Sequence, residues 1–213
     1  MTYDLHGQWD AGNQWASPGC PLGNCLRSHV NLTETTQSLA MITKAGVPAS
    51  KVLLGQALYG RTVRMTDPAC HGPDCTFRGG PNLGQATPGR CTQTRGYLAN
   101  FEIREILATN PSARLYRDSQ GDVLVYNDTQ WASFLTPESY ASRVGWAGQL
   151  NLGGTVDWAV DLDDDYGEHT VDPPTPAPSS SSIPVPQPAP TASATVADGT
   201  PSPGTTIDDG DGE

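Results

Sequence analysis

Tyrosine, aspartate and tryptophan stand close together in the first ten residues, M-T-Y-D-L-H-G-Q-W-D. Tyr3 supplies a hydroxyl and Asp4 a carboxylate, and both groups hydrogen-bond the hydroxyls and acetamides of sugars. Trp9 supplies a flat apolar ring on which one face of a pyranose can stack. This combination predicts a sugar-binding site. The alternative, on these residues alone, is an ordinary edge strand whose Tyr and Asp lie in a turn.

Clustered cysteines and carboxylates raise the question of a bound metal, and their spacing argues against one. Cys-x4-Cys occurs twice, but no histidine lies at the spacing of a zinc ligand. Asp161, Asp163 and Asp165 are spaced as in a calcium loop, but Tyr166 takes the position where the EF-hand turn requires glycine. We therefore expect no metal and no cofactor, and we interpret this segment as a solvated acidic strand end.

Strands must position the sugar-binding side chains, and the hydrophobic pattern predicts three of them. Residues 1–5 predict a strand whose successive side chains point to opposite faces. Residues 51–61 form a near-continuous apolar run, which is typical of a parallel strand covered on both faces. Residues 153–165 predict a third strand that ends in the carboxylates.

Two helices are expected beside these strands. Residues 33–45 predict a helix whose apolar stripe contains Leu39 and Ile42, and Gly46 supplies its C-terminal stop. A later helix is expected to start at Thr136-Pro137, because proline is pre-set for the first helical position, and to run to about residue 147.

The middle of the chain is rich in Gly, Pro, Cys and Thr and predicts fewer regular elements. Residues 97–109 look helical. Residues 114–118 and 122–127 flank Ser-Gln-Gly and predict a hairpin, in which the glycine is available for a positive φ. Trp131 and Phe134 are expected to cover one face of that hairpin.

Composition divides the chain into two unequal parts. From about residue 172 onward it consists largely of Pro, Ser, Thr, Ala and Gly, with no Lys, Arg, Cys or aromatic residue. Such a segment cannot bury enough apolar surface to offset its ordering entropy, so it predicts a disordered tail. A net charge of −11 without a basic cluster argues against a nucleic-acid partner. No apolar run is long enough to span a bilayer, so no membrane partner is expected.

Cysteines and glycosylation sequons indicate an extracellular protein. The five cysteines lie in Gly/Pro-rich loops, which favours disulfides, and their odd number leaves one without a partner in this chain. Asn31-Leu-Thr and Asn127-Asp-Thr are acceptor sequons for N-glycosylation. No signal peptide precedes Met1, so we expect this chain to have lost its N-terminal portion. The disulfide candidates are Cys20, Cys25, Cys70, Cys75 and Cys91.

Three motifs follow one another along the chain: Met-x-Tyr-Asp-x-x-Gly-x-Trp at 1–9, Gly-x-x-x-Tyr-Gly-Arg at 55–61 and Gly-Gly-Thr-Val-Asp-Trp-x-x-Asp-x-Asp-Asp at 153–164. In this order and at this plausible spacing they resemble motifs of glycoside hydrolase family 18, the chitinases. They are similar to the sixth, seventh and eighth strands of that family's barrel. The cysteine pattern, with Cys-His-Gly-Pro-Asp-Cys at 70–75, is most similar to the fungal killer-toxin-like chitinases.

The resemblance implies an α/β fold that is part of a TIM (β/α)8 barrel. Residues 1–61 would hold barrel strands six and seven with a helix, and residues 62–135 an α+β chitinase insertion domain. Residues 136–170 would hold the last barrel helix and strand eight, and residues 171–213 the disordered Pro/Ser/Thr-rich tail. Secretion is the localisation that the family implies.

The resemblance also implies chitin or chitooligosaccharides as the partner and a role for each matching residue. Tyr3 would hydrogen-bond the acetamido group of the sugar being cleaved, and Asp4 would lie beside the catalytic acid and help to hold that group. The other contacts would come from Trp158 under the sugar ring, Trp9 under a neighbouring sugar, and Tyr59 and Arg61 on the seventh strand.

The family hydrolyses β-1,4-linked N-acetylglucosamine with retention, assisted by the substrate's own acetamide. Its general acid is a Glu that closes the motif Asp-x-x-Asp-x-Asp-x-Glu, which this chain lacks and which we expect upstream of residue 1. The segment from Asp161 to Glu168 comes near, but Tyr166 replaces the last Asp, and the segment already serves as the end of strand eight. We therefore expect no catalytic residue in this chain and no activity from it alone. The alternatives are a non-catalytic, lectin-like chitooligosaccharide-binding protein and a disulfide-stabilised secreted module that binds no sugar.

Overall fold

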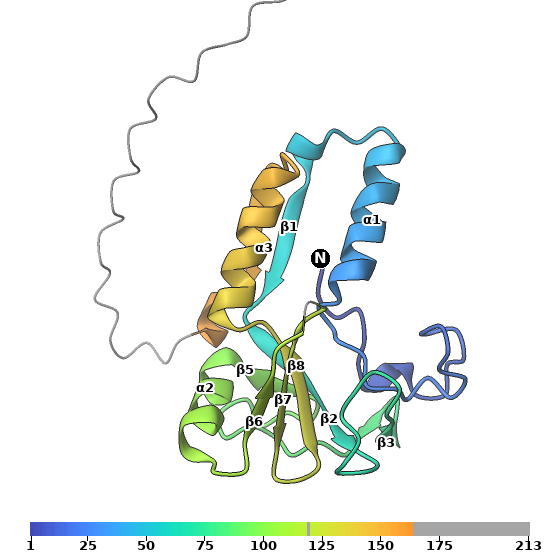
Figure 1. Ribbon diagram of the computed structural model, residues 1–213, viewed down its shortest axis with the longest axis vertical. Coiled ribbons are helices and arrows are strands. Elements are labelled where there is room, and N and C mark those ends of the chain that lie inside the picture. Colours follow the sequence, from blue (N-terminus) through green and yellow to red (C-terminus); the bar gives the residue numbers. More distant parts are fainter. Residues whose placement is uncertain (119, 164–213) are drawn as a thin grey trace, which may run out of the picture. The chain divides into compact units, whose positions relative to one another are not determined.

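A computed structural model describes residues 1–118 and 120–163, which form helices and two β-sheets (Figure 1). The predicted tail from residue 171 onward lies outside the described residues, as do Asp165, Tyr166 and Glu168. Besides the elements introduced below, three short 3-10 helices occur: η1 (Gln8–Asp10), η2 (Ala49–Lys51) and η3 (Val160–Leu162).

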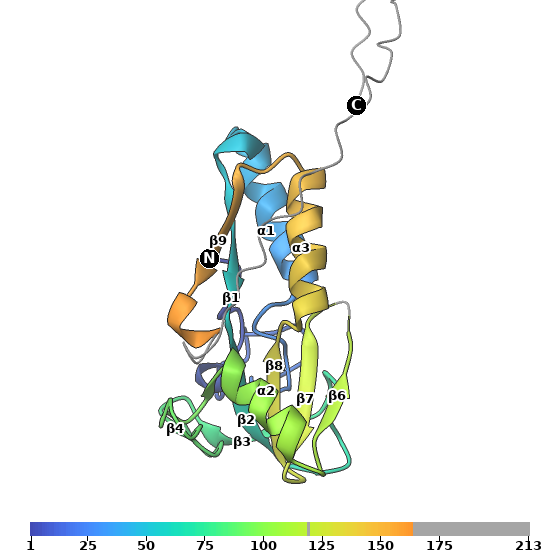
Figure 2. The same cartoon turned by 90° about the vertical axis from the view of Figure 1, so that its left-hand side faces the viewer.

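The first sheet consists of two parallel strands, β1 (Leu53–Ala57) and β9 (Gly154–Trp158). The helices α1 (Leu32–Lys44) and α3 (Pro137–Gln149) lie on one side of this pair (Figure 2). Leu39 of α1 and Ala147 of α3 enclose Leu54 of β1 in a buried cluster. The opposite face carries apolar side chains that remain exposed: Leu53 at 54%, Val156 at 49% and Trp158 at 59%.

The second sheet is antiparallel and is built from residues between Tyr59 and Phe134. Its strands are β2 (Tyr59–Met65), β3 (Phe77–Gly80), β4 (Leu83–Gly84), β5 (Tyr97–Ala99), β6 (Arg114–Tyr116), β7 (Asp122–Tyr126) and β8 (Gln130–Phe134). The strand order is β4-β3-β2-β8-β7-β6, and β5 pairs with β2. The helix α2 (Asn100–Thr109) packs Ile103 against Leu124 in one cluster, and Trp131 packs with Met65 in another.

Capping signals explain why the predicted helices α1 and α3 are confirmed to within a few residues. The Asn31 side chain accepts a hydrogen bond from the backbone N–H of Glu34 at 3.1 Å, and α1 ends before Gly46, whose φ is +97°. Thr136 caps α3 in the same way, with proline at the first helical position. One part of the prediction is wrong. Leu39 of the expected apolar stripe is buried, but Ile42 is 42% exposed.

The predicted opening strand is wrong, since residues 1–5 form no strand. Asp4 has a φ of +59°, in the left-handed region, which a strand does not use. Its backbone N–H donates to Nδ1 of His29 at 3.3 Å instead of joining a ladder. A tertiary contact has therefore replaced the strand pairing that the alternation predicted.

The apolar run at 51–61 is not one strand: it contains all of β1 and the start of β2, which belong to different sheets. The predicted strand at 153–165 is shorter, because β9 ends at Trp158 and η3 follows. The predicted helix at 97–109 begins with the three residues of β5.

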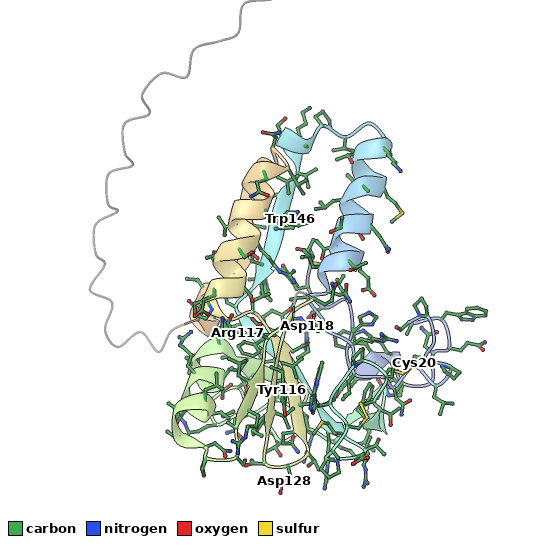
Figure 3. All side chains as sticks on the ribbon, in the orientation of Figure 1. Cys20, Tyr116, Arg117, Asp118, Asp128 and Trp146 are labelled. Carbon is green, nitrogen blue, oxygen red and sulfur yellow. A yellow bond between two sulfur atoms is a disulfide. The ribbon has the colours of Figure 1, made fainter. Side chains whose placement is uncertain are left out.

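The predicted hairpin of β6 and β7 is confirmed, but Trp131 and Phe134 do not merely cover it. They lie in β8, a further strand that pairs with β7 and β2. Asn127 and Asp128, with φ of +46° and +61°, form the turn between β7 and β8, and Figure 3 shows Asp128 at its tip.

The structure resolves the disulfide pairing. Cys20 bonds to Cys25 and Cys70 to Cys75, and Cys91 is a free, exposed thiol. Both bridges close loops of only four intervening residues. Within the residues that the structure describes, no helix is long and apolar enough to cross a membrane.

Candidate functional site

Five of the six predicted sugar-binding residues meet around the carboxylate of Asp4. The Tyr59 hydroxyl donates to Oδ1 of Asp4 at 2.6 Å. Arg61 donates through Nε to Oδ1 at 2.8 Å and through a terminal nitrogen to Oδ2 at 2.6 Å, a bidentate pair. The opening segment and the start of β2, more than fifty residues apart in the sequence, are thereby joined at one point.

These contacts fix the charge of Asp4. Burial by itself would raise the pKa of the carboxyl, but the hydrogen bonds from Arg61 and Tyr59 outweigh it and hold the pKa well below its usual range. Burial, and then the adjacent carboxylate, raise the pKa of the Tyr59 phenol. Asp4 is therefore an anion and Tyr59 a neutral donor at any ordinary pH. Neither residue is suited to transfer a proton. Tyr59, predicted to contact the sugar, is only 1% exposed, so it holds the carboxylate of Asp4 in place, and Asp4 is the more accessible of the two.

Aromatic rings surround the guanidinium of Arg61. Its central carbon lies 5.1 Å from the ring centroid of Trp9, 5.2 Å from that of Tyr59 and 5.3 Å from that of Tyr97. Tyr3 also approaches Tyr59, edge to face, with 6.1 Å between centroids. Cation–π and aromatic contacts of this kind hold the rings in place while Trp9 keeps 39% of its surface exposed.

Gly7 allows Trp9 to reach this position. A Cβ at residue 7 would lie 2.4 Å from carbons of the Trp9 ring, so the indole packs against a backbone that carries no side chain. The same indole carries the Arg61 guanidinium over its ring and remains partly exposed to solvent.

Trp158, the sixth residue, lies at the end of β9 rather than in the Asp4 cluster. Gly55 pairs with Val156, and a Cβ on Gly55 would lie 3.0 Å from the Tyr3 ring. Tyr3 therefore lies against the face of the sheet that carries Val156, and Trp158, two residues further on, points to that same face. Figure 2 shows that α1 and α3 lie on the other side.

Two residues of the site carry no signal in the sequence. His29, fully buried, packs its ring 5.2 Å from Tyr59, and burial lowers its pKa, so it is the neutral acceptor for the Asp4 backbone. No periodic pattern marks it. Tyr97 lies directly opposite Arg61 in β5, and burial raises its pKa to about 12. Gly96, just before β5, has a φ of +84°.

The other predicted sites lie apart from this cluster. Asp163 of the acidic segment accepts hydrogen bonds from Asn100 and Arg104. Of the sequons, Asn31 uses its side-chain oxygen to cap α1, and Asn127 is exposed in a turn. Among the described residues, no group of His, Cys, Asp and Glu could hold a metal ion. A cavity of about 490 Å³ lies between α2, α3 and η3, and none of the six predicted sugar-binding residues lines it.

A family profile matches this chain over residues 1–163, that of the glycosyl hydrolases family 18. Among curated proteins, the chain is 50% identical over 167 residues to "Secreted chitinase LysM12" and 48% identical over 174 residues to "Probable chitinase LysM11", both of Penicillium expansum. Each match covers 76% of this chain but only 11% and 16% of the two relatives.

Solved structures agree with this match. The group IV chitinase of Ostrinia furnacalis, in complex with allosamidin, aligns with a TM-score of 0.60 and 26% identity over 77% of this chain and 43% of that chain. A GH18 chitinase of Cycas revoluta, in complex with (GlcNAc)4, aligns with a TM-score of 0.59 over 76% of this chain and 42% of the other, and its 24% identity supports the fold alone. Chitinases of this family have a TIM-barrel fold, and this chain spans less than half of each.

Proposed function

The chain belongs to the glycosyl hydrolases family 18, and from this premise we propose that it forms the C-terminal half of a chitinase barrel. The opening residues would take the place of strand six, β1 of strand seven and β9 of strand eight. Parallel pairing of β1 with β9 is what neighbouring barrel strands require. Residues 62–135 would be the insertion domain, because the second sheet leaves at Tyr59, directly after β1, and returns at Phe134, directly before α3.

The substrate in this proposal is chitin, bound with one N-acetylglucosamine unit against the Asp4 cluster. The observation that carries it is the carboxylate of Asp4, fixed by Tyr59 and Arg61 within 2.8 Å and still 35% exposed. A fixed anion accepts a hydrogen bond from an acetamide N–H and orients the acetamide oxygen for attack on the anomeric carbon. The exposed indoles of Trp158 and Trp9 supply stacking surfaces for two sugar rings.

Binding and cleavage are separate in this proposal. The sequence contains no Asp-x-x-Asp-x-Asp-x-Glu motif, and Asp4 is too acidic to donate a proton near neutral pH. A general acid contributes roughly 10²–10⁴-fold to the rate. We therefore infer that residues 1–213 bind chitooligosaccharides without hydrolysing them. We also infer that the whole protein is secreted.

Calorimetry with chitotetraose and a fluorogenic chitobiose assay test this inference on the purified chain. We expect binding without release of fluorophore, and a loss of roughly fivefold or more in affinity for Trp158→Ala, since stacking contributes about 1 kcal/mol beyond area burial. Trp15→Ala is the matched control, because Trp15 is 84% exposed in a loop outside the site. Equal affinities for the two variants would contradict the assignment of Trp158.

A lectin-like function is the second candidate, and the same Asp4 cluster supports it because binding needs no general acid. Co-expression separates the two functions. The partner in this experiment is the barrel segment that precedes the matched region in one of the two Penicillium expansum relatives. Restored release of fluorophore supports a chitinase half-barrel. Binding that persists with no gain in hydrolysis supports the lectin-like function.

A further inference from the structure

The histidine of the opening segment, His6, is buried among carboxylates and takes no part in the Asp4 cluster. It is 4% exposed. Its Nδ1 lies 2.9 Å from Oδ2 of Asp10, and its Nε2 lies 3.0 Å from both carboxylate oxygens of Glu34. A neutral imidazole has one N–H and one lone pair, so only the doubly protonated ring can donate to both carboxylates.

The two carboxylates belong to different parts of the fold. Asp10 ends η1 and also accepts from the backbone N–H of Gly7 at 3.3 Å, which closes the turn that carries Trp9. Glu34 lies in the first turn of α1, 28 residues away in the sequence. His6 is therefore the link between helix α1 and the turn on which the Trp9 indole depends.

We propose that His6 is a positioning residue of the sugar site, which fixes Trp9 and Asp4 by tying their segment to α1. This inference rests on the proposed function, since it concerns the same site. The segment from Asp4 to Asp10 is held from one end by Arg61 and Tyr59 and from the other by His6. Releasing the second hold removes the tie of this segment to α1 and leaves the indole its contacts with Gly7 and Arg61.

The charges around His6 give this link a pH dependence. Burial lowers the pKa of His6, but the hydrogen bonds with Asp10 and Glu34 outweigh it and raise the pKa above its ordinary value. Two cations, Arg27 and Arg61, line a small cavity together with His6. Because the folded-state pKa is raised, the link is complete below the ordinary histidine pKa and is lost as pH rises through the raised value.

NMR of the full chain tests the proposal without any sugar. We expect the indole N–H signal of Trp9 to shift with pH at the same midpoint as the His6 ring, and Glu34→Gln to lower that midpoint because one carboxylate is removed. His6→Gln should abolish the shift, and His71→Gln, which removes a histidine outside the site, should leave it unchanged. A Trp9 signal that stays constant while the His6 ring titrates would overturn the proposal.

Chitotetraose calorimetry over the same pH range supplies the second readout. We expect affinity to fall roughly fivefold or more above the His6 midpoint, a size typical of coupling between sites, and to become independent of that midpoint in His6→Gln. Should His6→Gln fail to fold, Glu34→Gln carries the test, and an unmoved binding profile would count against the proposal. Absence of binding at every pH would contradict the proposed function alone, because the Trp9 signal still decides the role of His6.

Discussion

The two sheets of this chain differ in how completely their apolar residues are covered. All five residues of β8, in the middle of the second sheet, are buried, and none of the five residues of β9 is. The second sheet packs Trp131 on one side and Ile103 of α2 on the other. The first sheet is covered by α1 and α3 on one face only, and its other face exposes Leu53, Val156 and Trp158.

The residues proposed to bind the sugar lie where these two sheets meet. Tyr59 and Arg61 belong to the start of the well-covered sheet, and Trp158 to the exposed face of the other. Rigidity and exposure are thus divided between two regions, one of which fixes the polar contacts while the other presents an apolar surface.

Replacing a tryptophan in each sheet should give the widest contrast between the two. Trp131→Ala should destabilise the protein by about 3–5 kcal/mol, because it leaves a cavity where a 3%-exposed indole was packed. Trp158→Ala should change the free energy of unfolding by no more than about 0.5 kcal/mol, because its indole is largely in solvent. Urea denaturation followed by circular dichroism measures both, and similar losses in the two variants would show that the first sheet is also covered.

Acidification tests how strongly Asp4 joins its segment to the second sheet. Its pKa is lowered in the folded state, so its stabilising effect is present above an ordinary aspartate pKa and is lost as pH falls below about 4. Asp4→Asn should cost about 1–2 kcal/mol at pH 7, a value reduced for partial exposure, and should flatten the acid loss. Asp128→Asn, in an exposed turn, is the control (Figure 3). Equal acid dependence in both variants would contradict a special role for Asp4.

The smallest expected change in stability concerns α1, one of the two helices that cover the first sheet. Asn31→Ala removes the cap of α1 and should cost about 1 kcal/mol, whereas Asn31→Asp keeps a capping oxygen and should cost little. Both variants remove the sequon, so they also separate capping from any glycan at this position. Thermal melts of the three proteins at one pH give the comparison, and equal melting of the two variants would exclude the cap as the cause.

Local signals in the sequence predict the elements that are stabilised locally. The helices α1 and α3 carry their own caps and stops, so their predicted bounds agree closely with the structure. The strand β8 is not predicted, because its turn uses Asn127 and Asp128 in left-handed conformations, without the glycine that marks such turns most clearly. The prediction for the opening residues is wrong because a side chain 25 residues away, His29, takes their hydrogen bond.

The site is predictable to a similar extent and for similar reasons. Motif resemblance identifies Tyr3, Asp4, Trp9, Tyr59 and Arg61, and the structure brings them together. His29 and Tyr97 reach the cluster only through tertiary packing, which leaves no periodic trace. The contacts around Asp4 can therefore be recognised only in the three-dimensional structure.

The chain enters the second sheet through β2 and leaves it through β8. These two strands are neighbours, since Arg61 pairs with Ser133 across the ladder. All residues between β2 and β8 therefore form one long segment whose two ends lie side by side. The entropy of closing a loop grows only slowly with its length, by roughly 0.6 kcal/mol for each doubling. A change in the length of this segment should therefore alter the cost of closure only slightly, so residues can be added or removed between β2 and β8 with little effect on the pairing of β1 with β9.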